Sequence, residues 1–496
     1  MLRRVDVFFT YPLANKTASN RHIDSDTNAK CSKPANKTIR KRHLTMSQRK
    51  HKPQSSSHRH NAQKDSHASP TSDPIQQPRP PAHDDYAAWQ TYWQAQDQPW
   101  RTEPEINPER QQELTARRTI LPDIAKGIYP FKDIKLSRAD VEWLLATLEG
   151  GRGPVEWRDE RQREREGLDL RGADLRNLDL QSLPLARLRG SLTWKEGPSL
   201  TSEQRKAADI LLDRADFTQT HLEGARLAGI HLENAELRRT YLQEAYLIRI
   251  HLETSFLNEV HLERANLTGA YMEGTFLRKV QLGDENRIGP RLVDIQWGET
   301  NLAIVNWEQV KLLDDEYKAR QTTLRGKRKE ISKLINEYER AVRANRQLSV
   351  ALQSQGLNED AARFAYRAQV LQKNVLRLQI VQPAALLKHR LRSFWSWLLS
   401  WFLFLLAGYG YRAERSFLAY LVIIGIFTVL YHFLAPQLLW NETFVISMTA
   451  FHGRGFFPAT FSPGDPLALA SALEAFVGLI IEVTFIATLT QRFFGK

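Results

Sequence analysis

The sequence predicts a multidomain protein with four parts: a disordered polar tail, a repetitive solenoid, a helical hairpin and an α-helical membrane domain. Three observations carry this prediction. Residues 1–82 are rich in Lys, His, Asn, Ser and Pro, residues 217–282 repeat with a period of five, and residues 394–494 are strongly apolar. The 496 residues are enough for several domains, and their formal net charge is +13.

The basic tail, residues 1–85, has too few apolar side chains to offset the entropy of ordering a chain, so we expect disorder. Its basic run 33–43 could attract nucleic acid or anionic lipid by charge, but a solvated tail is the simpler interpretation, and we expect no nucleic-acid partner. The single cysteine, Cys31, excludes an intrachain disulfide framework. Met46 offers an alternative translation start.

Residues 86–166 are expected to form a small, mainly helical lead-in. Its clearest signal is Ser137, a capping residue with Asp140 three positions later, followed by apolar residues at helical spacing and a glycine stop at 150–151. We expect this segment to dock onto the part of the chain that follows it.

The solenoid is predicted from a strict repeat. From Phe217 to Leu282 every fifth residue is Phe, Leu or Met, and the residue two places earlier is small or β-branched. A period of five drifts by about 140° per step around a helix and leaves no apolar stripe. The pattern therefore indicates a chain that turns a corner every five residues. The same phase runs from Leu170, is interrupted by an insertion near 189–212, and resumes at Trp297.

Units such as "ADLRN", "ADFTQ" and "ANLTG" resemble the pentapeptide-repeat family, whose units follow A(D/N)LXX. The resemblance covers 167–307 and implies a right-handed, quadrilateral β-helix with about 20 residues per coil. Family members serve as interaction surfaces, which implies an unknown cytoplasmic protein partner. Some members mimic DNA, but residues 213–283 mix acidic and basic side chains almost evenly and lack the acidic face that mimicry needs.

The repeat also brings histidines into register, at His221, His231, His251 and His261. A coil of about 20 residues would stack His231 over His251, roughly 4.8 Å apart. A structural zinc site takes about four ligands, and the neighbouring members of these columns are Tyr and Gln. We therefore expect an outward-facing polar stack, no metal and no cofactor.

Residues 308–390 have apolar residues at three- and four-residue spacing, which predicts a helical hairpin. Gly356 and Asn358 break the pattern, and Asn358 is a candidate cap for the second helix. The hairpin loosely resembles one tetratricopeptide-type unit. Because a single such unit cannot stack into a binding groove, we expect a structural spacer.

The membrane domain is assigned to 391–496. The runs 417–435 and 467–489 are each long enough to cross a hydrocarbon core of about 30 Å, and Asp465 and Pro466 signal the start of the second. The run 394–408 is shorter and Trp-rich, which suggests an interfacial or re-entrant helix. Basic clusters flank the runs, and the positive-inside rule then puts both termini in the cytoplasm of a multi-pass protein of the inner (plasma) membrane, with membrane lipid as a partner.

Residues 415–493 resemble the two-helix pore module of potassium-channel-like proteins, with 441–452 in the place of the pore helix. The resemblance implies a homo-oligomer, most simply a tetramer. The pore-loop candidates are Thr449, His452, Gly453, Arg454 and Gly455. The usual Thr-Val-Gly-Tyr-Gly filter is missing, and Arg454 stands where the family has an aromatic residue, so potassium selectivity is not expected.

Three further candidates, Glu474, Gly478 and Glu482, fall at i, i+4 and i+8 on the predicted inner helix. A charge at the bilayer centre costs about 2.5–3.5 kcal/mol on insertion scales, so intramembrane acids suggest function. If this helix lines a pore, the acids would form rings and Gly478 a hinge. The alternative is that the acids are protonated, or bonded to Trp, Thr or His groups of neighbouring helices.

The sequence contains no phosphate-binding loop, no metal-spaced His/Glu motif and no nucleophile motif, so we do not expect an enzyme. The first functional hypothesis is an ion-channel-like membrane protein whose cytoplasmic repeat domain senses or binds a partner. The second is a membrane-anchored scaffold that transports nothing and works through its repeat surface.

Overall fold

The computed structural model describes residues 79–193, 196, 200–324, 327–382, 386–453 and 464–494, which all belong to one compact unit. Most of the predicted disordered tail, residues 1–78, lies outside the described residues, as do Arg454 and Gly455 of the pore-loop candidates.

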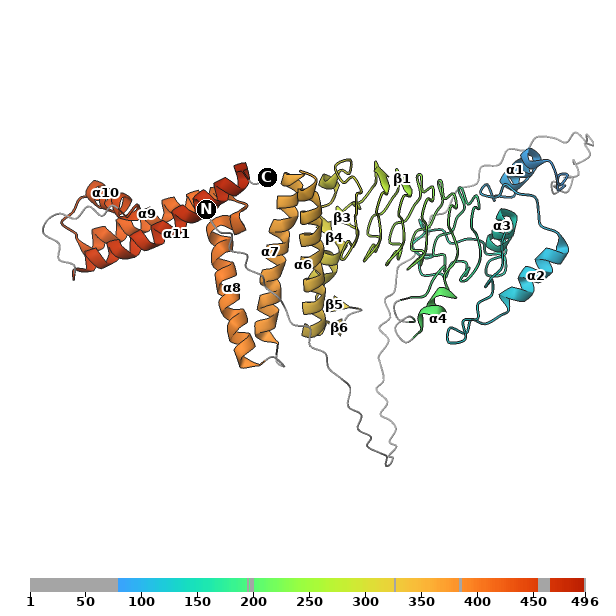
Figure 1. The fold of residues 1–496 in the computed structure, drawn as a ribbon, viewed down its shortest axis with the longest axis horizontal. Helices are drawn as coiled ribbons and strands as arrows, with labels where there is room; N and C mark the ends of the chain where they lie inside the picture. Colours follow the sequence, from blue (N-terminus) through green and yellow to red (C-terminus); the bar gives the residue numbers. More distant parts are fainter. Residues whose placement is uncertain are drawn as a thin grey trace, which may run out of the picture. The chain divides into compact units, whose positions relative to one another are not determined.

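The lead-in segment contains helices α1 (Tyr86–Ala95), α2 (Pro108–Arg118) and α3 (Arg138–Ala146). The predicted capping box of α3 is confirmed, since Ser137 Oγ accepts a hydrogen bond from Asp140 N and the Asp140 carboxylate accepts one from Ser137 N. Val141, Leu144 and Leu145 are buried in the same core as the first leucines of the repeat. Helix α3 therefore lies against the N-terminal end of the solenoid (Figure 1).

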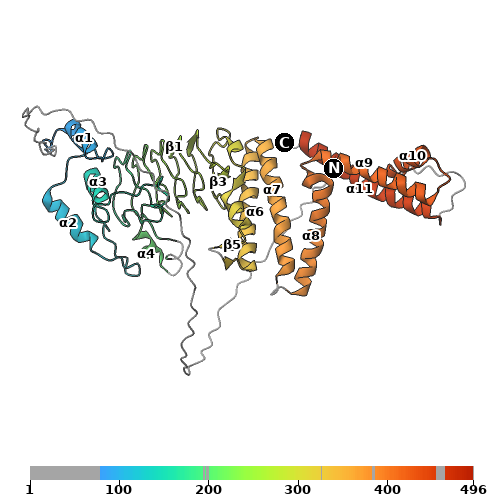
Figure 2. The same ribbon diagram turned by 180° about the vertical axis from the view of Figure 1, so that it is seen from behind.

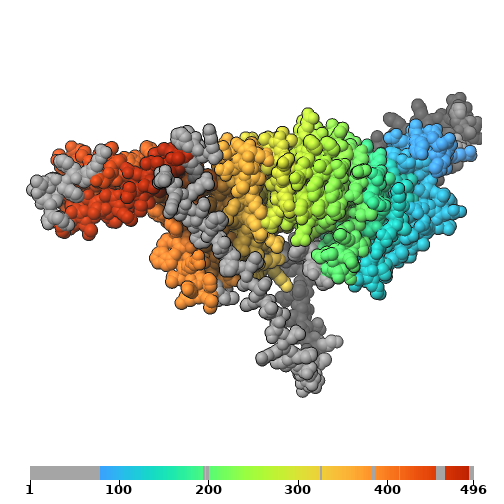
Figure 3. Space-filling model, viewed as in Figure 1, coloured from blue at the N-terminus to red at the C-terminus, as the bar shows by residue number. Residues whose placement is uncertain are grey.

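The repeat forms coils of 20 residues, as the resemblance implies. Parallel bridges join residues 20 apart, for example Asp216 to Glu236 and Glu236 to Phe256. The longest such ladder pairs strand β1 (Phe256–Asn258) with strand β2 (Phe276–Arg278) in parallel. Figure 2 shows the coils in succession from behind, and Figure 3 shows them, coloured green to yellow, as one continuous surface.

Each corner of a coil depends on a residue in left-handed conformation. From Arg214 to Lys279 every fifth residue has φ between +51° and +72°. This conformation costs a residue with a side chain about 1–2 kcal/mol, and only four of these positions are glycine. The cost is offset because the same residues bond to the next coil, as Arg249 N does to Thr268 O at 2.9 Å.

The small inward-facing position of each unit tolerates hydroxyl groups because the coils supply an acceptor. Thr220, Thr240 and Thr275 are at most 4% exposed. Each donates its hydroxyl to a main-chain carbonyl of a neighbouring coil, with distances of 2.7–2.8 Å. No buried hydroxyl at these three positions is left without a partner, which avoids a desolvation cost of about 1–3 kcal/mol for each group.

Two insertions interrupt the coils. Asp174 pairs with Leu211 and Arg189 with Arg226, a separation of 37 positions instead of 20, so 17 residues are inserted. The inserted residues lie in the segment between Gly190 and Ile210, where the chain leaves the ladder and rejoins it. This segment also contains the short helix α4 (Ser202–Lys206). Later, Asn266 pairs with Arg291, which places five extra residues in the following coil.

The C-terminal end of the solenoid begins at strand β3 (Ile288–Gly289), which pairs with β4 (Leu312–Leu313). The 3-10 helix η1 (Trp307–Gln309), helix α5 (Asp314–Arg320) and the hairpin of β5 (Thr323–Leu324) and β6 (Lys327–Arg328) complete it.

Two long helices then follow, α6 (Ile331–Ser354) and α7 (Asn358–Val381), and they lie side by side in both ribbon views (Figures 1 and 2). Trp307 packs edge-on against Phe364, with ring centroids 6.1 Å apart. Arg367 donates two hydrogen bonds to buried Glu316, at 3.0 and 2.9 Å. Asn358 does not cap α7: it is the first helical residue, and the N-cap is Leu357, which makes no side-chain bond.

The C-terminal part consists of α8 (Leu387–Ala407), the 3-10 turn η2 (Gly408–Gly410), α9 (Ala413–Leu434), α10 (Trp440–Phe451) and α11 (Pro466–Phe494). Among the described residues, three helices are long and apolar enough to cross a membrane, at 387–410, 414–434 and 466–490. Helix α8 is longer than the predicted 394–408 because its basic first turns are helical as well. Helix α8 is therefore long enough to cross a membrane as a third span. The interfacial position of this helix stays a prediction.

The stability of the C-terminal end of the solenoid is expected to depend on pH through Asp315 of α5. Burial raises the pKa of its carboxyl group from 3.8 to about 7, although Leu292 N donates to it at 2.9 Å. Between pH 4 and 7 the folded state then holds a proton that the unfolded state has lost, so stability falls as pH rises through this window. In urea unfolding of the full chain, Asp315→Asn should gain stability relative to wild type from about pH 4 to about pH 7, with a constant difference above. A difference that does not change with pH would contradict this assignment.

Candidate functional site

The candidate site is the place where the short helix α10 packs against both long apolar helices, α9 and α11 (Figure 1). Phe427 and Tyr431 of α9, Ile446 of α10 and Leu467 of α11 share one buried apolar cluster. A second cluster joins Phe451, at the end of α10, to the other two helices. Helix α10 is thus packed on both of its neighbours within one chain.

Glu474 joins the three helices through polar contacts. Its side chain is fully buried. One carboxyl oxygen accepts from Tyr431 Oη of α9 at 2.6 Å, and the other accepts from Ser447 Oγ of α10 at 2.5 Å. Two hydroxyl donors therefore satisfy a carboxyl group that is buried among three apolar helices, where an unpaired carboxyl group would be costly.

Gly478 allows α10 and α11 to approach closely. A Cβ atom at this position would collide with the main-chain carbonyl oxygen of Phe451, in the last turn of α10. Small residues serve this purpose at helix contacts in membranes, where close packing rather than the hydrophobic effect holds helices together.

The described pore-loop candidates lie at the end of α10. The Thr449 hydroxyl is 2.9 Å from the carbonyl oxygens of both Val445 and Ile446, so it bonds within its own helix. His452 caps the helix and donates from Nδ1 to Met448 O at 2.7 Å. Gly453 has φ +66° and turns the chain away.

The third member of the predicted stripe also faces α10. Glu482 is about one-third exposed, and its Oε1 lies 3.5 Å from His452 Nε2. The stripe of Glu474, Gly478 and Glu482 therefore packs on α10 along its whole length, with Gly478 in close contact with Phe451, and a hinge at Gly478 stays a prediction. Pore lining by this stripe stays a prediction. Within one chain, the contacts of Glu474 match the alternative of bonding to neighbouring helices.

The sequence pattern did not reveal the partners of Glu474. Tyr431 and Ser447 are separated from it by 43 and 27 positions, and nothing in the spacing of α11 points to them. The available signal was weak: Ser447 is one of three hydroxyl residues in α10, with Thr443 and Thr449, and a buried hydroxyl needs a partner.

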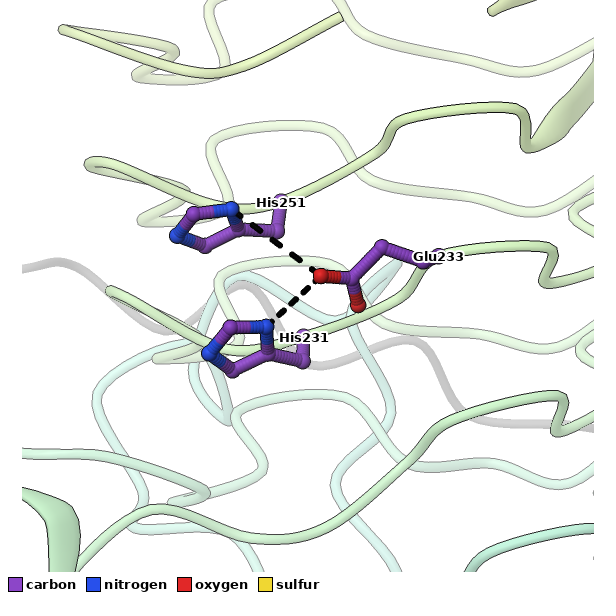
Figure 4. A group of neighbouring side chains, drawn as sticks. All are labelled: His231, Glu233 and His251. Carbon is purple, nitrogen blue, oxygen red and sulfur yellow. Dashed lines mark hydrogen bonds and ion pairs between the residues drawn. The ribbon is translucent and has the colours of Figure 1, made fainter.

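The histidine stack of the repeat is present as predicted. The rings of His231 and His251 stack with centroids 4.4 Å apart and planes within 11°, and Tyr271 continues the column. Figure 4 shows both Nδ1 atoms turned toward Glu233, at 2.7 and 4.0 Å from its Oε1. These three ligand atoms lie within 4.8 Å of one another, and among the described residues no fourth joins them. Three ligands fall short of a structural zinc site, and the absence of a metal stays a prediction.

Comparison with known proteins identifies the coils. A family model described as pentapeptide repeats matches residues 215–253 and 245–284, and the chain therefore contains a pentapeptide-repeat domain. Among curated proteins no match is found.

Solved structures that are similar to this chain include three pentapeptide-repeat or related proteins of low sequence identity. HetL, a pentapeptide repeat protein involved in heterocyst differentiation regulation from the cyanobacterium Nostoc sp. strain PCC 7120, is 21% identical to this chain in the matched region. The match covers 32% of this chain and 54% of HetL, with a TM-score of 0.15. QnrB1, a plasmid-mediated fluoroquinolone resistance protein, has 14% identity over 30% of this chain and 86% of its own, with a TM-score of 0.17. Rfr23, a pentapeptide repeat protein from the cyanobacterium Cyanothece 51142, is 25% identical. The match covers 23% of this chain and 85% of Rfr23, with a TM-score of 0.09.

We expect Gly478→Ala to loosen α10, because the added methyl group collides with the Phe451 carbonyl. Overpacking of this kind costs about 1–3 kcal/mol, which should lower the thermal unfolding temperature of the detergent-solubilised chain. Gly425→Ala in α9 is the matched control, since no atom lies within 4 Å of its Cβ position. Equal effects of the two substitutions would show that the close approach at Gly478 is unimportant.

The contacts of Glu474 predict a measurable coupling between Tyr431 and Ser447. Replacing Glu474 by Leu removes the carboxyl acceptor shared by both hydroxyls and leaves Ser447 only Ile424 O, 3.1 Å away, whereas Gln keeps a polar partner for each. Polar contacts between membrane helices contribute about 0.6 and up to about 1.7 kcal/mol each. We expect Glu474→Leu to be less stable than Glu474→Gln in the same unfolding assay. Tyr431→Phe and Ser447→Ala should have smaller effects, and both should vanish in the Leu background. Effects that add fully in that background would contradict the network.

Proposed function

We propose that this protein is an oligomeric, ion-channel-like membrane protein whose pentapeptide-repeat domain lies in the cytoplasm. The observation that carries the proposal is α10, a short apolar helix held between two long apolar helices by Glu474. Long helix, short helix and long helix follow each other here in the order of a pore module.

The length of α10 supports this assignment. Its 12 residues span about 18 Å at 1.5 Å per residue, which is too short for a core of about 30 Å. The chain must then enter and leave on one side of the membrane. Irregular backbone at membrane depth is tolerated only where protein or a water-filled cavity surrounds it. The residues after Phe451 would find such surroundings at the axis of a homo-oligomer, most simply a tetramer.

The proposed selectivity differs from that of potassium channels. Arg454 follows Gly453 directly in the sequence, and a ring of guanidinium groups near a pore axis would repel cations. We propose that the pore is not potassium-selective, and that His452 and Glu482, in contact at the end of α10, lie close to the ion path.

The proposed topology keeps the repeat domain in the cytoplasm of a cell with α9 and α11 in its inner membrane. Basic residues before α9 and after α11 support this orientation by the positive-inside rule. Helix α8 would then lie at the interface, and its exposed Trp395 and Trp401 suit the headgroup level. A crossing by α8 would instead put the repeat domain on the other side.

A membrane-anchored scaffold is the second candidate function. It is favoured by an arginine-lined groove on the repeat domain, described below, which offers a binding surface that needs no transport activity. We propose neither an enzymatic activity nor a cofactor for either function, because no catalytic motif is recognisable in the sequence.

Conductance of the purified full-length chain in planar bilayers tests the channel proposal. We expect wild-type currents that are not potassium-selective. Arg454→Ala should shift the reversal potential in a salt gradient toward cation preference, because a ring of positive charge is removed. Glu482→Gln is expected to change the ion preference in the opposite direction, since it removes negative charge.

Arg278→Ala on the repeat domain is the control and should leave the currents unchanged. Silence from a well-folded oligomer would contradict the channel proposal and leave the scaffold. An ion preference that is the same in both variants and in wild type would remove Arg454 and Glu482 from the ion path.

A further inference from the structure

The repeat domain carries a groove of about 950 Å³ along one face of its coils. A column of bridged residues, Arg226, Tyr246, Asn266 and Arg291, forms its floor, with one residue from each of four successive coils. Steps of about 4.8 Å between strands make this column roughly 14 Å long. The groove is open to solvent.

The groove is rich in arginine. Two of its lining residues are acidic, Glu244 and Asp294. Six are arginines: Arg187, Arg226, Arg249, Arg291, Arg340 and Arg343.

Three of the arginines already have carboxylate partners. Arg226 pairs with Glu166 at 3.1 Å, and Arg291 pairs with Asp314 at 2.7 Å. Arg343 pairs with Asp294 at 3.4 Å. Arg249 and Arg340 are exposed, and no ion pair joins either of them to another described residue. These two side chains keep their full charge available to a ligand.

Helix α6 closes one end of the groove and is fixed there by specific bonds. Gln347 accepts from Asp294 N at 2.9 Å and donates to the Asp294 carboxylate at 3.2 Å. Arg340 and Arg343 precede Gln347 by seven and four positions, so all three lie on one face of the helix. Arginines from the helical hairpin and from the coils thus converge on one space.

Three backbone N–H groups of the groove floor are already engaged. Arg226 N, Tyr246 N and Asn266 N all bond to carbonyls of adjacent coils at 2.8–2.9 Å. Phosphate sites in proteins commonly use free backbone N–H groups at helix ends or nests. On this floor the available donors are therefore side chains, and the planar guanidinium fork binds oxyanions such as carboxylates in two-point geometry.

We propose that this groove binds an acidic, carboxylate-rich segment of a partner protein. The acidic residues on its walls favour separate, spaced carboxylates over the continuous charge of a nucleic-acid backbone. Tyr246 is its one aromatic lining residue, whereas single-stranded nucleic acids bind to successive stacking platforms. The proposal concerns the coils and helix α6 and does not depend on whether the C-terminal apolar helices conduct ions.

Fluorescence anisotropy of the full-length chain in detergent tests this proposal. The probe is a labelled synthetic peptide of alternating glutamate and glycine, compared with its glutamine counterpart and with a single-stranded oligonucleotide. We expect the glutamate peptide alone to bind well, and the affinity to fall with added salt. Arg249→Glu combined with Arg340→Glu should weaken binding at least about tenfold.

The matched control is Arg238→Glu combined with Arg278→Glu. It makes the same change in charge on the face of β1 and β2, two corners away from the groove, and should leave the peptide affinity within about twofold of wild type. Equal losses in both double variants would reduce the effect to net charge and overturn the proposal. Tighter binding of the oligonucleotide, or no peptide binding by a chain with wild-type thermal unfolding, would overturn it as well.

Discussion

The structure depends on one constraint above all, the hydrogen-bond ladder that holds successive coils in a register of 20 residues. Each coil turns its corners through left-handed residues, which is unfavourable for residues such as Arg249 and Glu244. The ladder offsets this cost only if paired positions keep their register, because a shift of one residue would turn the buried leucines outward. The sequence repeat is strict for this reason.

The register also decides what the surface can do. Residues 20 apart in sequence become neighbours at strand spacing, so any side chain repeated at that interval becomes a column. The same rule builds the stack of His231 and His251 and the floor of the arginine groove. Insertions do not disturb it when they leave and rejoin at paired positions, as between Gly190 and Ile210.

Sequence reasoning was sufficient wherever a local rule sets the structure. The period of five predicted the coils, and the capping box predicted the start of α3. It was insufficient where the outcome depends on how a helix is rotated or where its first turn begins. The spacing of Glu474, Gly478 and Glu482 places them on one stripe, but spacing cannot say which neighbour the stripe meets. The basic first turns of α8 hid its full length, and Gly356 turned the chain so that Asn358 entered α7 instead of capping it.

The apolar helices of the C-terminal part differ from the coils in the contacts that hold them together. No ladder joins them, and for helices that lie in lipid the hydrophobic effect does not drive association. The position of α10 therefore depends on a few groups, chiefly the carboxyl group of Glu474 and the missing side chain of Gly478. Any role of the segment after Phe451 depends on these contacts, since they fix the point from which the chain leaves α10. A conservative change in this small set would alter function while leaving the apolar pattern of the sequence intact.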